Sequence, residues 1–154
     1  MTVKFATLLD VIEHRAQTHA DAPLYGFLGD DDALAAPRFG DLVARGRAVA
    51  AALQRIAGPG DRVLLLLPSG LDVIVGLLAT LLAGVVCVPL PVTTHRRAGF
   101  AAQARDAGAR VAVSDRATID RLRDHPDAAG LRWLALDDPQ DASWTRPPTQ
   151  PDDL

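Results

Sequence analysis

Residues 73–92, VIVGLLATLLAGVVCVPLPV, carry no charged side chain. An apolar run of about 18 or more residues is long enough to cross a bilayer as a helix. A helix over 71–84 would be only about 21 Å long, against about 30 Å for the hydrocarbon layer. To extend further it would have to include the valine-rich segment 85–88 and then Pro89, which breaks a helix. We therefore expect a buried helix over 71–84, a buried strand over 85–88, and no membrane span.

Short apolar runs and helical patterns alternate around this segment. VLLLL at 63–67 is bounded by turn residues, which is typical of a strand buried on both faces of a parallel sheet. Further strands are predicted at 111–114 and 133–136, with helices over about 98–108 and 115–124. This alternation predicts an α/β fold with a doubly wound, mainly parallel sheet, flanking helices and right-handed crossovers.

Two amphipathic helices are predicted before the sheet, over 7–19 and about 41–56. In the first, Thr7 is placed to cap the helix. LYGFL at 24–28 resembles a short strand, and 29–37 is predicted to be a turn with an acidic tip. The apolar positions of the first helix that recur at helical spacing are Leu8, Val11 and Ile12, with Arg15 in the same series.

The chain is expected to divide into an α/β subdomain over 1–136 and a tail over 137–154. The tail, DDPQDASWTRPPTQPDDL, is rich in proline and aspartate. Such composition is typical of a surface loop or linker.

Composition excludes several classes of protein. The formal net charge of −3 does not suggest a dedicated nucleic-acid binder. Cys87 is the single cysteine, so one chain cannot form a disulfide framework or a cysteine-rich zinc site. The N-terminus, MTVKFATLLDVIEHRAQ, lacks the basic start and unbroken apolar stretch of a signal peptide. We expect a water-soluble, cytoplasmic protein.

No catalytic, cofactor-binding or metal site is predicted from the residues alone. No glycine-rich dinucleotide fingerprint or phosphate-binding loop follows any predicted strand. The turn Pro68-Ser69-Gly70 has one glycine and no lysine, so we interpret it as a plain turn rather than an anion site. The spacing of the histidines does not favour a shared metal, and Cys87 is interpreted as a small core residue. The histidines are His14, His19, His95 and His125, and the acidic turn holds Asp30, Asp31 and Asp32.

An arginine-rich segment spans 96–123, with seven arginines against three aspartates. A basic surface of this kind could steer an acidic partner or a phosphorylated ligand. The alternative is a pair of helices whose charged faces are solvated and partly paired. Both interpretations remain open at this point.

Several segments resemble a known family. GDRVLLLLPSGLDVIVGLLATLLAGVVCVPLP at 60–91 resembles the first signature of the adenylate-forming (AMP-binding) ligases, in particular the fatty acyl-AMP ligases. Four other segments resemble the same family, so the resemblance covers essentially the whole chain. They are LLDVIEHRAQTHADAPLYGFLGD at 8–30, RDAGARVAVSD at 105–115, LRWLALDD at 131–138 and PDDL at 151–154.

The resemblance implies an enzyme that activates a fatty acid with ATP and Mg²⁺ to an acyl-adenylate and transfers the acyl group to an acyl carrier protein. In that family the phosphate loop, the metal-binding glutamate and the catalytic lysine match no position of this chain. The resemblance therefore implies an N-terminal fragment of the N-terminal subdomain, inactive alone. It would serve as scaffold, with Leu90, Pro91 and Val92 in the wall of the acyl tunnel.

The chain departs from the family pattern at three places, one of which is PLPVTT at 89–94 in place of an unbroken proline run. Val73 stands where an aromatic residue is usual, and Pro37-Arg38-Phe39 replaces a Leu-Thr-Tyr sequence. Arg38 cannot accept a hydrogen bond from a backbone N–H, so the second helix is expected to be capped by Gly40 or Asp41 instead.

Two hypotheses follow. The first is an N-terminal fragment of a fatty acyl-AMP ligase from lipopeptide or polyketide biosynthesis. The second is a stand-alone, non-catalytic α/β module that binds a protein partner through the arginine-rich segment 96–123. Under the first hypothesis, surface left uncovered by truncation predicts self-association.

Overall fold

A four-stranded parallel sheet forms the centre of the protein in a computed structural model, which describes residues 4–23, 25–29, 32–92, 100–138 and 143–150. The order of the strands is β4-β3-β5-β6, and every neighbouring pair is parallel. The predicted α/β fold is confirmed. The strands are β3 (Arg62–Leu66), β4 (Val86–Pro89), β5 (Val111–Ser114) and β6 (Arg132–Ala135).

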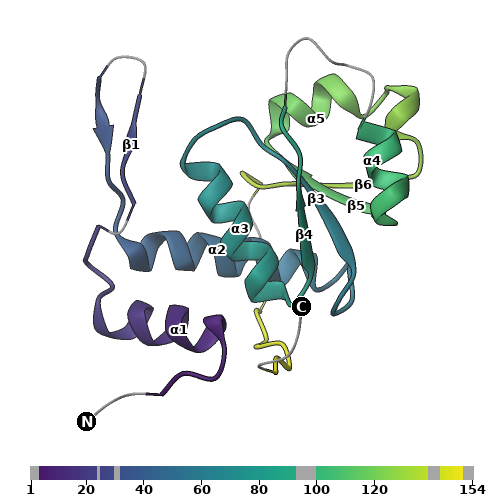
Figure 1. The fold of residues 1–154 in the computed structure, drawn as a ribbon. Helices are drawn as coiled ribbons and strands as arrows, with labels where there is room; N and C mark the ends of the chain where they lie inside the picture. The colour runs from purple at the N-terminus through teal and green to yellow at the C-terminus, as the bar shows by residue number, and fades with distance from the viewer. Residues whose placement is uncertain (1–3, 24, 30–31, 93–99, 139–142, 151–154) are drawn as a thin grey trace.

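Helices cover both faces of this sheet. The chain passes from β3 to β4 in one direction and then crosses back over β3 to reach β5 and β6. Because such crossovers are right-handed, the connecting helices must lie on opposite faces. Figure 1 shows α2 and α3 on one side of the sheet and α4 and α5 on the other. The helices are α2 (Phe39–Leu53), α3 (Leu71–Ala83), α4 (Phe100–Ala107) and α5 (Arg116–Leu122), and a 3-10 helix, η1 (Pro126–Ala128), precedes β6.

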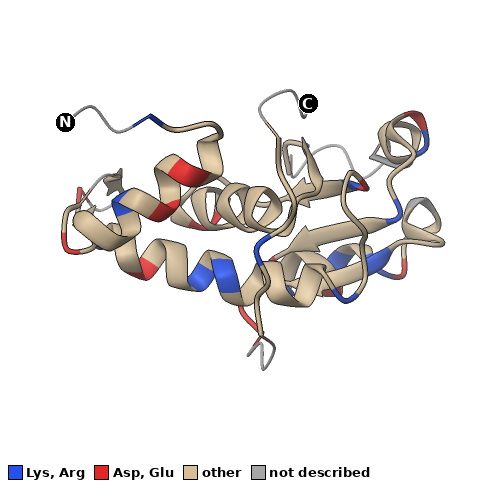
Figure 2. Cartoon of the chain, turned by 90° about the horizontal axis from the view of Figure 1, so that it is seen from below, with Lys and Arg blue, Asp and Glu red and all other residues tan. Residues whose placement is uncertain are grey.

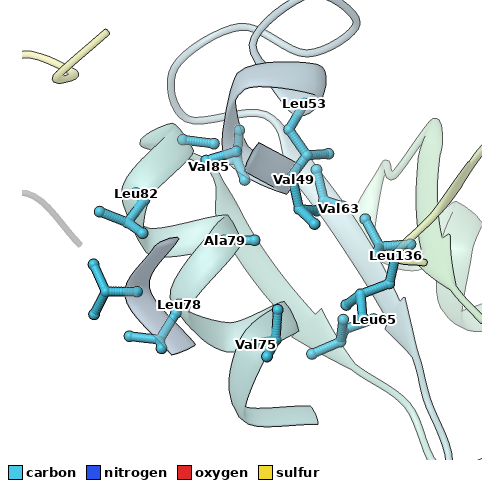
Figure 3. Close-up of a cluster of buried hydrophobic side chains, with 14 of the residues drawn as sticks. Val49, Leu53, Val63, Leu65, Val75, Leu78, Ala79, Leu82, Val85 and Leu136 are labelled. Atoms are coloured by element: carbon cyan, nitrogen blue, oxygen red, sulfur yellow. The ribbon is translucent and has the colours of Figure 1, made fainter. Parts of the chain in front are cut away.

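The central position of β3 explains why its residues 63–66, after the exposed Arg62, are all apolar. Val63 and Leu65 face the cluster formed with α2 and α3, whereas Leu64 and Leu66 face the cluster that contains Ala104 of α4. A central strand with a helix layer on each face must be apolar at every position. Figure 3 shows the first of these clusters, where side chains of α2, β3 and α3 meet.

The uncharged run folds as the sequence predicts. Helix α3 ends at Ala83, Gly84 adopts a left-handed conformation with φ 75°, and the chain turns into β4. Among the described ranges, no helix has both the length and the apolar character that a bilayer crossing requires. The packing of this helix is tight, since a Cβ on Gly76 would lie 2.5 Å from Leu65 Cδ1. The prediction that β4 is fully buried is wrong, because β4 is an edge strand and its Val86, Cys87 and Val88 are half-buried.

Helix α1 (Leu8–Thr18) lies against α2 as an additional layer (Figure 1). The predicted cap is confirmed: Thr7 Oγ1 accepts from the Asp10 backbone N–H at 3.2 Å, and the Asp10 carboxylate accepts from the Thr7 N–H at 2.9 Å. The predicted apolar face is confirmed at Ile12 but wrong at Leu8, whose place is taken by Leu9. Leu9 and Ile12 are buried, whereas Leu8 is 62% exposed.

A small hairpin extends from the helical layers (Figure 1). Strand β1 (Phe27–Leu28) pairs antiparallel with β2 (Leu34–Ala35), and Leu28 lies opposite Leu34. The predicted turn over 29–37 is confirmed only in part, because the Gly29 N–H donates to the Ala33 carbonyl at 3.0 Å across a turn, whereas Leu34 and Ala35 form a strand. Asp32 has φ 59° in the turn, while Asp30 and Asp31 lie outside the described residues.

Helix α2 begins without a side-chain cap. Its N-cap residue is Arg38, and the caps predicted at Gly40 or Asp41 do not form. Instead, the Phe39 and Gly40 backbone N–H groups donate to the carbonyls of Ala22 and Ala20 at 3.0 and 2.8 Å. These carbonyls accept hydrogen bonds from two N–H groups that have no partner within the helix. Backbone groups thus take the place of the side-chain cap that Arg38 cannot provide.

The tail has no helix or strand within 143–150, yet it lies against three helices. Trp144 Nε1 donates to the Leu82 carbonyl at 2.8 Å, and Arg47 lies 4.9 Å from the centre of the Trp144 ring. Gln54 exchanges two hydrogen bonds with the Thr145 backbone, at 2.7 and 3.2 Å. The Arg146 guanidinium pairs with carboxylates of α1. We refer to residues 143–150 below as the tail strap.

Candidate functional site

The carboxyl ends of β3 and β5 form the position in this sheet where a ligand site is expected. These strands are neighbours, yet the helices that follow them leave to opposite faces of the sheet. Such a switch point opens a crevice beyond the strand ends, and open α/β sheets bind their ligands there. The residues that surround it are the turn 67–70, the segment 90–92 and the first residues after β5.

The turn after β3 is an ordinary strand-to-helix connection. Leu67 is buried, Pro68 and Ser69 are exposed, and the Val73 backbone N–H donates to the Gly70 carbonyl at 3.2 Å. No side chain caps the start of α3. Asp72 occupies the first turn of that helix and pairs with Arg45 at 2.8 Å. A carboxylate at this position opposes the binding of a phosphate, in agreement with the interpretation of residues 68–70 as a plain turn.

The last residue of β5 and the first residue after it carry polar groups that sequence reasoning did not single out. Ser114 is fully buried, and its hydroxyl donates to the Leu66 carbonyl, which ties β5 to β3 at the switch point. Asp115 caps α5, because its Oδ1 accepts from the Thr118 N–H at 2.8 Å. Its Oδ2 is buried and has no partner among the described residues. This oxygen can therefore accept a further hydrogen bond.

The predicted tunnel residues follow β4 at the same end of the sheet. The Leu90 backbone N–H donates to the Leu65 carbonyl at 3.0 Å, which extends the strand pairing by one residue. Leu90 and Val92 are half-buried and pack against the cluster on the α4 face, whereas Pro91 is exposed. The structure therefore brings Leu90 and Val92 together on one apolar surface and leaves Pro91 outside it.

The histidines and Cys87, the other residues considered for a metal-binding or reactive site, do not lie together. The His14 ring lies 5.1 Å from that of Phe5, and His19 Nδ1 lies 2.8 Å from Thr18 Oγ1. His95 falls outside the described residues. Burial raises the pKa of the half-buried Cys87 thiol, which disfavours the reactive thiolate. Across the described part of the chain, no three histidine, cysteine or acidic side chains are grouped so that they could hold a metal ion.

The arginine-rich segment is partly neutralised by acidic neighbours. Arg116 pairs with Asp138, which raises the pKa of the guanidinium. Arg123 lies 3.7 Å from Asp120 and 3.9 Å from Asp124. Figure 2 shows basic and acidic segments interspersed along the helices. Arg96 and Arg97 lie outside the described residues.

Comparison with known proteins defines the class. The family model for AMP-binding enzymes matches residues 12–153, and the chain belongs to this family. The fold agrees with a crystal structure of a fatty acid AMP ligase from Legionella pneumophila, with a TM-score of 0.85 and 26% identity. That match covers 96% of this chain and 27% of the solved chain.

Two curated relatives lie in the fatty-acid branch of the family. A medium-chain-fatty-acid–[acyl-carrier-protein] ligase, JamA of Moorena producens, is 34% identical over 57% of this chain and 15% of its own length. A long-chain-fatty-acid–AMP ligase, FadD32 of Mycolicibacterium smegmatis, is 40% identical over 51% of this chain and 13% of its own length. The chain thus spans a small part of each relative, and the resemblance to fatty acyl-AMP ligases is confirmed.

Proposed function

We propose that this chain is the first part of the N-terminal α/β subdomain of a fatty acyl-AMP ligase. The enzyme would activate a fatty acid with ATP to an acyl-adenylate and transfer the acyl group to an acyl carrier protein. The observation that carries this proposal is the fold match to a fatty acid AMP ligase over 96% of the chain. The names of the two curated relatives, a fatty-acid–carrier-protein ligase and a fatty-acid–AMP ligase, support the same substrate class.

The described residues of this chain do not fit ATP or Mg²⁺ by themselves. A magnesium ion with a triphosphate requires clustered oxygen ligands and cationic donors. At the switch point the turn 67–70 has no lysine, and the nearby Asp72 is already paired with Arg45. We therefore assign nucleotide and metal binding to residues outside these 154, and to this chain the role of scaffold.

We further propose that Leu90, Pro91 and Val92 contribute to the wall of the acyl-binding tunnel. Their support is the apolar surface that Leu90 and Val92 form at the carboxyl end of β4. A fatty acyl chain binds to such a surface through the hydrophobic effect alone. A cytoplasmic location belongs to the same proposal, because ATP is available there.

The test is ATP–pyrophosphate exchange with fatty acids of different lengths. A longer protein that contains these residues and the remaining parts of the family pattern should exchange pyrophosphate when a fatty acid is present. The 154-residue chain should show no exchange above the background without fatty acid. Exchange catalysed by the 154-residue chain would overturn the assignment of scaffold, and no exchange by the longer protein with any fatty acid would overturn the proposed substrate.

The module that binds a protein partner remains the alternative. The pairing of Arg116 and Arg123 with aspartates reduces the charge that such a surface would offer. Loss of exchange in the longer protein, together with capture of an acidic protein by residues 96–123, would favour it.

A further inference from the structure

An open pocket of about 320 Å³ lies at the amino-terminal edge of the sheet, opposite the switch point. Its walls are formed by the end of α4 and by the segment that joins η1 to β6. Its charged members are Arg105 and Arg110. Most of the remaining wall is small or apolar and includes Ala104, Ala109, Gly130 and Leu131.

Local backbone structure fixes the segments that carry the two arginines of the pocket. Helix α4 ends when Gly108 adopts φ 66° and its N–H donates to the Arg105 carbonyl at 3.0 Å. The chain then enters β5 directly after Arg110. The backbone at Arg110 is also fixed to the start of β6, since the Arg132 N–H donates to the Arg110 carbonyl at 2.9 Å. Both guanidinium groups therefore extend from backbone that the sheet and the helix end hold in place.

Neither arginine has a counter-ion among the side chains that the structure describes. Unlike Arg116 and Arg123, Arg105 and Arg110 make no ion pair with any carboxylate in the described part of the chain. Asp106 is exposed beside Arg105 but does not line the pocket. Two unpaired guanidinium groups next to an apolar wall attract an anion that also carries a small organic group.

We propose that this pocket binds the phosphate monoester group of a small organic molecule. A guanidinium presents its donors in a planar fork that matches phosphate oxygens bidentately. A phosphate monoester carries nearly two negative charges and three acceptor oxygens, so it can engage both arginines at once. A single carboxylate has only one negative charge to offer the pair. The pocket volume is at the lower limit of small-molecule sites, so the organic part must be small.

The experiment is a titration of the ¹⁵N-labelled chain with phenyl phosphate at low ionic strength, observed by two-dimensional NMR. Saturable shifts are expected for the backbone amides of Gly108, Gly130 and Leu131, with a dissociation constant in the millimolar range. Arg105→Gln combined with Arg110→Gln should weaken binding at least about tenfold, as expected for the loss of charge-assisted hydrogen bonds. Arg55→Gln removes an exposed arginine at the end of α2 and should change the dissociation constant less than twofold.

Two further probes determine the ligand class. Inorganic phosphate should bind more weakly than phenyl phosphate, because it does not contact the apolar wall, and acetate more weakly still. Arg105→Lys combined with Arg110→Lys keeps the charge but loses the fork, and should give intermediate affinity. Equal affinity for acetate and phenyl phosphate, unchanged binding by the glutamine double variant, or shifts that do not saturate would each overturn the proposal. An unchanged amide spectrum in the unbound variants confirms that they are folded.

Discussion

At the scale of the residue, Asp10 connects the two ends of the described chain. Its carboxylate accepts backbone N–H groups at the start of α1 and also pairs with Arg146 of the tail strap. The Arg146 guanidinium, followed by the Thr7 N–H, lowers the pKa of Asp10 to about 2. The ionised Asp10 carboxylate thus caps α1 and also binds the tail strap, which is more than a hundred positions away in the sequence.

This pairing predicts a pH dependence of stability. The pKa of Asp10 is about 2 in the folded chain, against about 3.9 for an unfolded aspartate. Because the folded value is the lower one, ionised Asp10 stabilises the fold above about pH 4, and this contribution is lost as the pH falls toward 2. Asp10→Asn should therefore show a smaller difference between the urea midpoints at pH 6.5 and pH 3 than the unaltered chain.

Asp41→Asn is the matched control for this measurement. Asp41 is also in the first turn of a helix but forms no ion pair within the described residues. Its variant should keep the pH dependence of the unaltered chain. If Asp10→Asn and the unaltered chain lost stability equally on acidification, the Arg146 pairing would not contribute.

At the scale of the element, the tail strap and the end of α3 depend on Trp144. The indole N–H donates to the Leu82 carbonyl, one of the last carbonyls of α3, which have no partner within the helix. Trp144→Ala should lower the free energy of unfolding by about 2 kcal/mol, through lost packing and one lost hydrogen bond. Trp144→Phe should cost about 1 kcal/mol, because a smaller aromatic ring still packs at this position while the hydrogen bond is lost. Urea unfolding measures both.

Thr145→Ala provides the control for the strap. Thr145 contacts Gln54 through its backbone N–H and carbonyl, which the substitution leaves in place, and its side chain is exposed. Its effect should stay within about 0.5 kcal/mol. If Thr145→Ala lowered the free energy of unfolding as much as Trp144→Ala, the effect could not be assigned to the indole.

The regular elements of this chain were accessible from its sequence because their patterns are local. The apolar run of β3, the uncharged stretch of α3 and the stop at Gly84 each follow from composition and turn residues within a few positions. Strand β2 was missed because a two-residue strand has no alternation to detect. The attachment of the tail was missed because it depends on single side chains, Trp144 and Arg146, in a segment whose prolines and aspartates are typical of linkers.

The order of the strands in the sheet could not be predicted from local sequence patterns, and the candidate site depends on this order. An apolar run predicts a strand but not its neighbours, so β4 was expected to be buried although it lies at the edge. Ser114 and Asp115 have meaning only because β5 lies next to β3, which places them at the switch point. Leu90 and Val92 were identified through family resemblance, and their part in a tunnel remains a prediction.

At the scale of the whole molecule, exposed apolar side chains predict self-association. Leu28 and Leu34 lie opposite each other on the hairpin and are 60% and 69% exposed. The short hairpin and the β4 edge both present unpaired backbone groups, which favours pairing between chains. Dynamic light scattering should detect growth in mean size with concentration, and Leu28→Lys combined with Leu34→Lys should reduce it.

Leu8→Lys is the control that shows whether self-association depends on the hairpin or on any exposed apolar side chain. Leu8 is 62% exposed but lies on α1 rather than on a strand. This variant should associate like the unaltered chain. A single monomeric species of the unaltered chain at high concentration would contradict the prediction.

The position of β5 beside β3 has a consequence for how the chain reaches its native state. The bond between Ser114 and Leu66 joins residues 48 positions apart, and α3, β4 and α4 lie between them in the sequence. During synthesis β3 meets β4 first, whereas the central pair of the sheet must wait until this long loop has emerged and closed. Closing such a loop is entropically slow, and folds rich in distant pairings acquire structure late. We therefore expect β3 to pair with β5 later than with β4.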